Sequence, residues 1–166
     1  MAIGGLGAKL SLAVKSMELI AFEELGAEVV LVKGDISEEE TAKRLIETTV
    51  ERFGRIDILL NNAGISNPKL LVDMTKEDWD RMIAVDLTSV FLTCKYAVPV
   101  MIKQNFGRII NMSSQIGQKG SIEHCHYSAA KAGSSKALRT FSIRGRAKMS
   151  ICSCGMVFGR RSIICS

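Results

Sequence analysis

The sequence lacks the features that mark several common classes of protein. Its 166 residues contain no uninterrupted apolar run of the ~18 residues that a membrane-spanning helix needs. Met1 leads into no signal-peptide pattern. The five cysteines show no metal-site spacing, because Cys152-x-Cys154 has no second pair to complete a ligand set. We therefore expect a cytoplasmic protein with reduced thiols, without a membrane contact or a bound metal.

Acidic residues are absent from residues 139–166, which carry six basic side chains. The preceding 138 residues carry 16 basic and 17 acidic side chains, so the net charge of +5 belongs to the end of the chain. A basic segment can bind nucleic acid electrostatically. Since neither interleaved aromatic residues nor a base-reading motif accompanies it, we do not expect a nucleic-acid partner.

Two histidines in the last third of the chain could suggest a metal site. His124 and His126 flank Cys125, but no carboxylate stands at ligand spacing from them. We expect them to be substrate-loop or surface residues.

One stretch does contain side chains suited to proton transfer. Tyr127 and Lys131 stand four apart in the helix-favouring sequence YSAAK, so both side chains project from one helix face. A cation beside a phenol favours the ionised form, and such a pair can give a proton to a carbonyl oxygen or take one from an alcohol. Ser114 follows the apolar run 109–112, at a strand end where open α/β sheets bind ligands. The same spacing also fits a helix start with a half-buried tyrosine.

Apolar segments typical of strands alternate with segments at helical spacing. Strands are expected at 10–14, 28–33, 56–60 and 107–112, and helices at 17–25, 37–53 and 89–104, with another beginning at Thr75. Ser37 with Glu40 has the spacing of a helix N-terminal capping box, and Thr75, followed by Glu77-Asp78, is expected to cap another helix. At this length and 47% hydrophobic residues, the chain can form one domain with a core.

Three ordered motifs resemble the short-chain dehydrogenase/reductase family, in particular its 3-oxoacyl-carrier-protein reductase and ketoreductase members. Gly34-Asp35-Ile36 and Asn61-Asn62-Ala63-Gly64 each follow an apolar strand, and Ser114 precedes Tyr127-x-x-x-Lys131. The resemblance extends over residues 7–133. It implies an α/β fold, a three-layer Rossmann-type doubly wound parallel sheet.

The resemblance also implies roles for individual residues. Tyr127 would be the general acid, Lys131 its electrostatic tuner and a ribose ligand, and Ser114 the donor that orients the carbonyl. Asp86 stands where most relatives have an asparagine that holds a proton-relay water; it keeps the size but loses the amide donors and adds a charge. The implied reaction is the reversible reduction of a ketone or 3-oxoacyl group of a small molecule by a homodimer or homotetramer.

The cofactor implied by the resemblance is NADP(H) rather than NAD(H). The position that is acidic in NAD-dependent relatives is Val14, and a basic residue follows it. The expected cofactor-binding residues, besides the catalytic tyrosine and lysine, are Lys15, Ser16, Asp35, Ile36, Asn62, Ala63 and Gly64.

Both ends of the chain depart from the family pattern. Relatives begin with a strand and a Thr-Gly-x-x-x-Gly-x-Gly turn, whereas Gly4, Gly5 and Gly7 lack this spacing. We expect the first strand and the phosphate-binding turn to be absent. Near the other end, we expect 149–155 to be a degenerate version of a later strand of the family and the last strand to be missing. The chain would then be a truncated domain over residues 1–158 with an irregular basic tail over 159–166. The alternative function is a catalytically inactive fragment that acts only by oligomerising or binding a partner.

Overall fold

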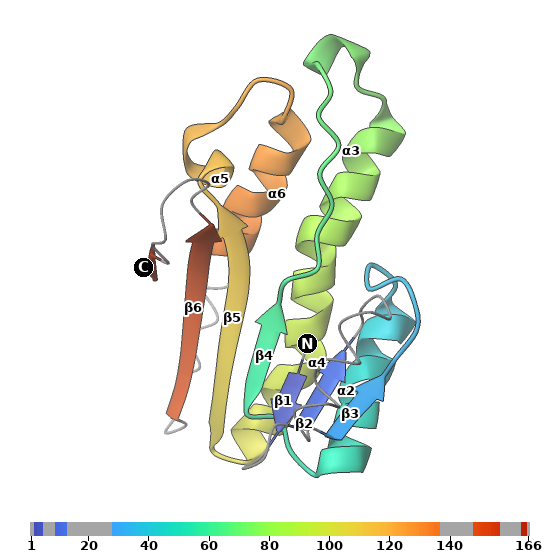
Figure 1. Cartoon of the computed structure of the whole chain (residues 1–166), viewed down its shortest axis with the longest axis vertical. Coiled ribbons are helices and arrows are strands. Elements are labelled where there is room, and N and C mark those ends of the chain that lie inside the picture. Colours follow the sequence, from blue (N-terminus) through green and yellow to red (C-terminus); the bar gives the residue numbers. More distant parts are fainter. Residues whose placement is uncertain (1, 5–8, 13–27, 137–147, 157–163, 166) are drawn as a thin grey trace.

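The computed structural model describes residues 2–4, 9–12, 28–136, 148–156 and 164–165, which form a sheet with helices packed against it (Figure 1). The elements are β1 (Ala2–Gly4), β2 (Lys9–Leu12), β3 (Glu28–Leu31), α2 (Glu39–Phe53), β4 (Ile58–Asn61), the 3₁₀ turn η1 (Leu71–Asp73), α3 (Lys76–Ile83), the π-helical turn η2 (Ala84–Thr88), α4 (Ser89–Lys103), β5 (Phe106–Ser114), α5 (Ile116–Lys119), α6 (Cys125–Lys136), β6 (Lys148–Met156) and β7 (Ile164–Cys165).

The strands form one sheet in the order β3-β2-β1-β4-β5-β6-β7. The pairs β2–β3, β4–β5 and β5–β6 are parallel, whereas β1 and β7 are antiparallel to their neighbours. Helices α2, α4 and α6 lie on one face of the sheet (Figure 1). Right-handed crossovers place them there, because the chain moves in one direction from β3 through β4 and β5 to β6. This is the expected α/β Rossmann-type arrangement; the helix expected at 17–25 lies outside the described residues.

The expectation that a first strand is absent was wrong, because β1 lies in the sheet between β2 and β4. It runs against both neighbours: Ala2 pairs with Ser11 and Leu59, and Gly4 pairs with Lys9. Only four residues separate β1 from β2. A parallel crossover needs a dozen or more residues, whereas an antiparallel return needs two to five. As a result, Gly4 lies at the amino edge of the neighbouring strands.

The C-terminal part of the sheet is more regular than the sequence indicates. The strand expected at 149–155 is confirmed as β6, which pairs in parallel with the whole length of β5. Within the segment expected to be an irregular tail, Ile164 and Cys165 form β7 and pair antiparallel with β6. Isoleucine favours strands, and β7 pairs with Cys154 and Gly155 on the outer edge of β6.

The helix ends only partly follow the capping predictions. The Ser37–Glu40 box was wrong: α2 begins at Glu39, and the backbone N–H and hydroxyl of Ser37 both donate to Asp35 at 2.9 and 2.6 Å. The predicted end of this helix at Gly54 is confirmed, with a left-handed φ of 75°. The prediction that Thr75 caps the next helix is confirmed, and Thr75 and Asp78 exchange both hydrogen bonds of a capping box.

The core lies between the sheet and helices α2 and α4. Its central cluster is Ile46, Ile56, Leu59, Val90, Cys94, Ala97, Met101 and Ile109. The continuous helical stretch Lys76–Lys103 is long and apolar enough to cross a membrane, but half of its most apolar window is buried in the structure. A core helix packed on a sheet passes the same test of length and composition.

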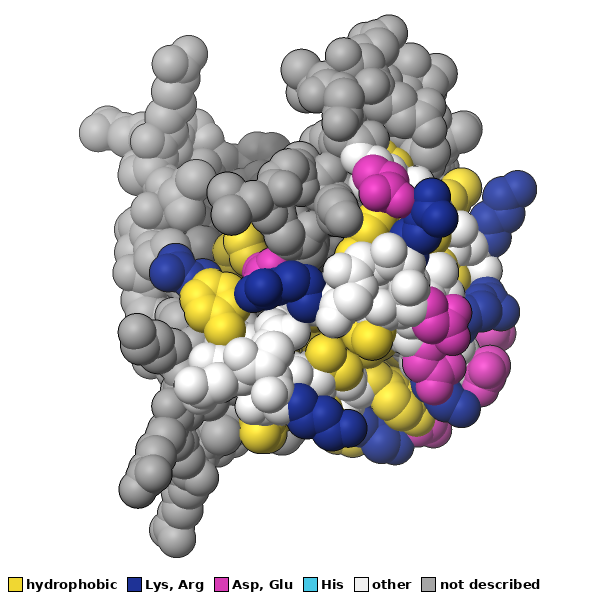
Figure 2. Space-filling view, turned by 90° about the horizontal axis from the view of Figure 1, so that it is seen from below, with side chains coloured by type: hydrophobic (Ala, Val, Ile, Leu, Met, Phe, Trp, Pro, Cys, Tyr) yellow, Lys and Arg dark blue, Asp and Glu magenta, His cyan; other side chains and the backbone are white. Residues whose placement is uncertain are grey.

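The described surface shows charges of both signs. Seen from below, Lys and Arg side chains alternate with Asp and Glu side chains and with apolar ones, so no single-sign patch covers the described part of this face (Figure 2).

Candidate active site

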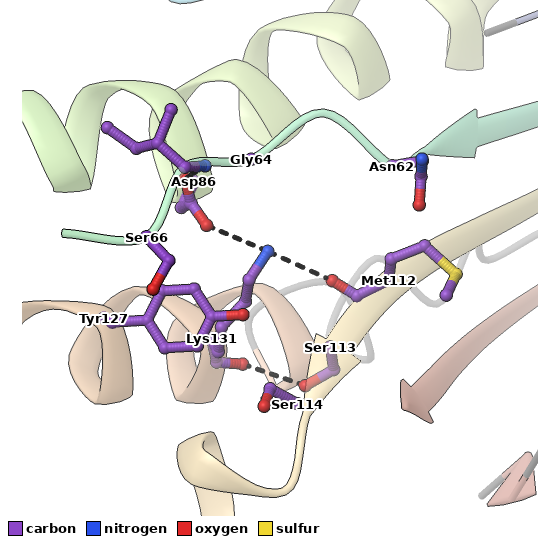
Figure 3. Close-up of a pocket in the computed structure, with 10 residues that line it drawn as sticks. Asn62, Gly64, Ser66, Asp86, Met112, Ser113, Ser114, Tyr127 and Lys131 are labelled. Carbon is purple, nitrogen blue, oxygen red and sulfur yellow. Dashed lines mark hydrogen bonds and ion pairs between the residues drawn. The ribbon is translucent and has the colours of Figure 1, made fainter. Parts of the chain in front are cut away.

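A pocket of about 220 Å³ lies where the loop after β4, the end of β5, η2 and α6 meet (Figure 3). Its lining residues are Asn62, Gly64, Ile65, Ser66, Asp86, Met112, Ser113, Ser114, Tyr127 and Lys131. Carboxyl ends of parallel strands are the usual ligand-binding edge of such sheets. The volume is below the ~300–1,000 Å³ of drug-sized ligand sites, so the pocket suits a small group or one end of a larger ligand.

The three residues predicted for proton transfer line this one pocket. Ser114 ends β5, while Tyr127 and Lys131 lie one turn apart on α6, as the YSAAK spacing predicts. The Lys131 ammonium lies 5.5 Å from the centre of the Tyr127 ring. The hydroxyl of Ser114 accepts a 3.2 Å hydrogen bond from the Ile116 N–H. Their catalytic roles stay predictions.

Helix α6 is held close to the end of β5. The hydroxyls of Ser113 and Ser134 donate to the Lys131 carbonyl at 3.2 and 3.1 Å. Gly117 of α5 packs directly on the α6 backbone: a Cβ there would lie 2.8 Å from Ala132 N and from Lys131 C. The position of the lysine backbone is therefore fixed from two elements.

Asp86 joins the pocket from the π-helical turn, a type of helix irregularity that is frequent at functional sites. Its side chain is fully buried. Oδ1 accepts a 2.8 Å hydrogen bond from the Ile65 N–H, and Oδ2 lies 3.0 Å from the Lys131 ammonium. The ammonium also donates to the Met112 carbonyl at 3.4 Å. Asp86 thus binds both the loop after β4 and the lysine.

A buried polar network below the pocket was not among the predicted site residues. Asn61 donates to Asn111 at 2.8 Å, and Thr93 donates to Asn61 at 2.8 Å, which connects β4, β5 and α4. Polar residues within otherwise apolar strands were the available signal, because buried polar groups need partners. The network ties the end of β4 to β5 just before the strand end that carries Ser114.

Only some of the predicted cofactor residues come together at the pocket. Asn62 and Gly64 line it, whereas Ala63 between them is exposed and does not. Lys15 and Ser16 lie outside the described residues. Asp35 and Ile36 follow β3 and do not line the pocket.

The carboxylate of Asp35 is engaged within the protein. It accepts the hydrogen bonds from Ser37 and forms a 2.6 Å ion pair with Arg81 of α3. These hydrogen bonds from Ser37, with the Arg81 guanidinium, lower the pKa of Asp35 to about 2. Asp35 therefore acts at least as a turn residue that links the β3 loop to α3.

The expectation that both histidines lie in a substrate loop or at the surface was wrong for His126, which is fully buried. It shares a stripe at helical spacing with Ala130 and Ser134, the inner face of α6. His124 packs edge-on against Tyr127, with 5.9 Å between ring centres. Among the described residues, no three His, Cys, Asp or Glu side chains form a metal-binding group.

The two cysteines whose side chains are described, Cys94 and Cys125, are free thiols. Burial raises the pKa of Cys94 to about 11, so its thiol stays protonated at neutral pH.

Comparison with known proteins agrees with the motifs. The family model described as short chain dehydrogenase matches residues 3–156. A 3-oxoacyl-(acyl-carrier-protein) reductase of Synechocystis sp. is 44% identical over 108 residues, which are 65% of this chain and 44% of the relative. The reductase FabG of Thermotoga maritima is 44% identical over 99 residues, 60% of this chain and 40% of the relative. Nodulation protein G of Azospirillum brasilense is 41% identical over 111 residues, 67% of this chain and 45% of the relative. The chain thus spans less than half the length of these relatives.

Proposed function

The chain belongs to the short-chain dehydrogenase family, and from that premise we propose that it acts as an NADP(H)-dependent oxidoreductase that reduces a ketone or 3-oxoacyl group to an alcohol. The observation that carries this proposal is that Ser114, Tyr127 and Lys131 line one pocket at the carboxyl edge of the sheet. The names of two of the relatives above, both 3-oxoacyl-(acyl-carrier-protein) reductases, support the reaction class. We further propose a cytoplasmic protein with one domain over residues 1–158 and a short basic tail.

In this proposal each pocket side chain has a distinct task. The Ser114 hydroxyl would donate a hydrogen bond that orients the substrate carbonyl, and the Tyr127 hydroxyl would transfer its proton to the carbonyl oxygen. The Lys131 ammonium would stabilise the phenolate that remains, since it lies beside the ring. When bound, the nicotinamide cofactor supplies a hydride for the carbonyl carbon. Asn62, Gly64, Tyr127 and Lys131 would hold its nicotinamide and ribose.

The phosphate end of the cofactor fits less well than the nicotinamide end. A pyrophosphate needs a glycine-rich turn and a helix N-terminus at the carboxyl edge. Gly4 pairs with Lys9 and so lies at the amino edge, and no described glycine turn replaces it next to β2 or β4. This observation favours a second candidate function, an inactive protein of the same family that acts by association. The preference for NADP(H) rests on Lys15 and Ser16 and stays a proposal.

Cofactor binding and turnover by the purified chain test the proposal. NADPH and NADH titrations followed by fluorescence should show that NADPH binds more tightly, and a ketone should then oxidise the bound NADPH. Tyr127→Phe should reduce turnover ~10²–10⁴-fold, because only the proton donor is removed. Tyr96→Phe is the matched control, since Tyr96 is half-buried on α4 and its hydroxyl bonds to Glu39, away from the pocket. Full activity in Tyr127→Phe would mean that another group performs the chemistry. If the chain binds neither NADPH nor NADH and reduces no ketone, the result would support the second candidate.

A further inference from the structure

The ion pair between Asp86 and Lys131 differs from the other ion pairs of the described residues. Its side chains are 0% and 8% exposed, whereas every other described pair leaves both side chains at least 16% exposed. A buried pair loses hydration on both sides, which its mutual attraction only partly repays. Burying this pair therefore costs free energy, and its two charges strongly affect the electrostatic potential around them.

The surroundings of the pair leave little freedom to the ammonium. Gly64 packs on it so closely that a Cβ would lie 2.9 Å from Asp86 Oδ2 and 3.1 Å from Lys131 Nζ. The Met112 carbonyl takes a second ammonium contact at 3.4 Å. The Ile65 N–H fixes the other carboxylate oxygen at 2.8 Å. Figure 3 shows the ammonium between Asp86 and Met112.

We propose that Asp86 is a positioning residue that holds the Lys131 ammonium against the protein and weakens the positive charge with which this ammonium would stabilise a Tyr127 phenolate. The Asp86 carboxylate, 3.0 Å from the ammonium, opposes the positive potential that the ammonium exerts on the Tyr127 ring 5.5 Å away. The ammonium forms an ion pair with Asp86 and donates a hydrogen bond to the Met112 carbonyl, both of them groups of the protein. An asparagine at this position would keep a carbonyl oxygen for the Ile65 N–H and remove the negative charge. The sequestration follows from the pocket geometry alone, while its consequence for turnover rests on the proposed function.

Amine labelling of the whole purified chain without cofactor tests the sequestration. Acetic anhydride is added, and mass spectrometry compares acetylation of Lys131 with that of the exposed Lys103. Asp86→Asn should raise this ratio about tenfold, because the ammonium loses its anionic partner. Asp80→Asn is the matched control: it removes an aspartate from the exposed pair with Lys76 in the same helical stretch and should leave the ratio unchanged. An unchanged ratio in a folded Asp86→Asn variant would overturn the proposal.

Two further measurements separate the possible outcomes. If Asp86→Asn does not fold by circular dichroism, the double variant Asp86→Asn with Lys131→Met should fold, because neither charge then stays buried alone. Failure of the double variant would mean that Asp86 serves something other than Lys131, and the proposal would fall. In a folded Asp86→Asn, the rising limb of the pH profile for alcohol oxidation should move to lower pH, because the negative charge beside the ammonium is gone. A raised labelling ratio without turnover in either protein would leave the sequestration standing and remove the proposed function.

Discussion

Substituting Gly117 by alanine should displace α6 without altering any chemical group of the pocket. The added Cβ would lie 2.8 Å from two α6 backbone atoms, of Lys131 and Ala132, whereas ordinary contacts begin at 3.4 Å. Backbone atoms inside a helix cannot turn aside as a flexible side chain can. Helices α5 and α6 must therefore separate by about 0.6 Å, which would move Tyr127 and Lys131 on α6 relative to Ser114 at the end of β5.

The size of the effect follows from two opposing terms. Alanine in place of a helical glycine stabilises by ~0.5–1 kcal/mol, while overpacking costs ~1–3 kcal/mol. We expect a net loss of about 1–2 kcal/mol, which for a chain of this size lowers the melting temperature by ~2–8 °C. If the parent chain is catalytically active, the reaction rate of the variant should fall about tenfold or more, because a 1 Å misplacement of catalytic groups costs ~10²-fold in rate.

Thermal unfolding by circular dichroism, together with the ketone assay, measures both effects. Gln118→Ala in the same short helix is the control, because this side chain is exposed and should change the melting temperature little. A Gly117→Ala variant that melts at a higher temperature than the parent would refute the reasoning, because propensity would then outweigh the crowding.

Two other predictions concern the rest of the described chain. The hydrogen bonds from Ser37, with Arg81, hold the pKa of Asp35 at about 2, below its ordinary 3.8. The ionised Asp35 therefore stabilises the fold above pH ~4, and this contribution is lost as the pH falls towards 2. In Asp35→Asn, the urea concentration at the unfolding midpoint should therefore depend less on pH between pH ~4 and ~2. An unchanged pH dependence would mean that the carboxylate does not stabilise the fold. The half-exposed Phe91 and Ile102 of α4 leave apolar surface, so light scattering at tens of micromolar should show a dimer or larger assembly, and a monodisperse monomer would contradict this.

The features that local spacing determines were predictable from the sequence. Tyr127 and Lys131 share a helix face because helical periodicity fixes residues four apart on one side. The Thr75–Asp78 box likewise depends only on residues within one turn. The position of the pocket was predictable as well, because parallel strands place their carboxyl ends at one edge of the sheet.

The features that the sequence did not predict depend on competition between partners. Ser37 has the spacing of an N-cap, but the Asp35 carboxylate captures both its donors and the helix begins later. His126 has a polar side chain, yet its place on the inner face of α6 buries it. The direction of β1 depends on the length of its connection to β2 rather than on its own composition. None of these outcomes is encoded in a single local pattern.

The separation between the two ends of the proposed cofactor site leads to a last prediction. The residues that would hold the nicotinamide and ribose lie in the continuous segment 62–131 and are supported by the core. The phosphate end would depend on a glycine turn at the carboxyl edge, whereas Gly4 lies at the amino edge. Reduced nicotinamide mononucleotide, which lacks the adenylate half, should therefore bind within about tenfold of NADPH.

Competition titrations followed by nicotinamide fluorescence measure the two affinities, with Tyr127→Phe and Tyr96→Phe as pocket and surface variants. Each factor of ten in affinity corresponds to about 1.4 kcal/mol. If the chain kept its phosphate contacts, NADPH would bind more tightly than the mononucleotide by several factors of ten. NADPH binding a hundredfold or more tightly than the mononucleotide would contradict the prediction. It would mean that residues beyond those described, or a second copy of the chain, supply the phosphate contacts, because the pocket residues proposed above would hold only the nicotinamide half.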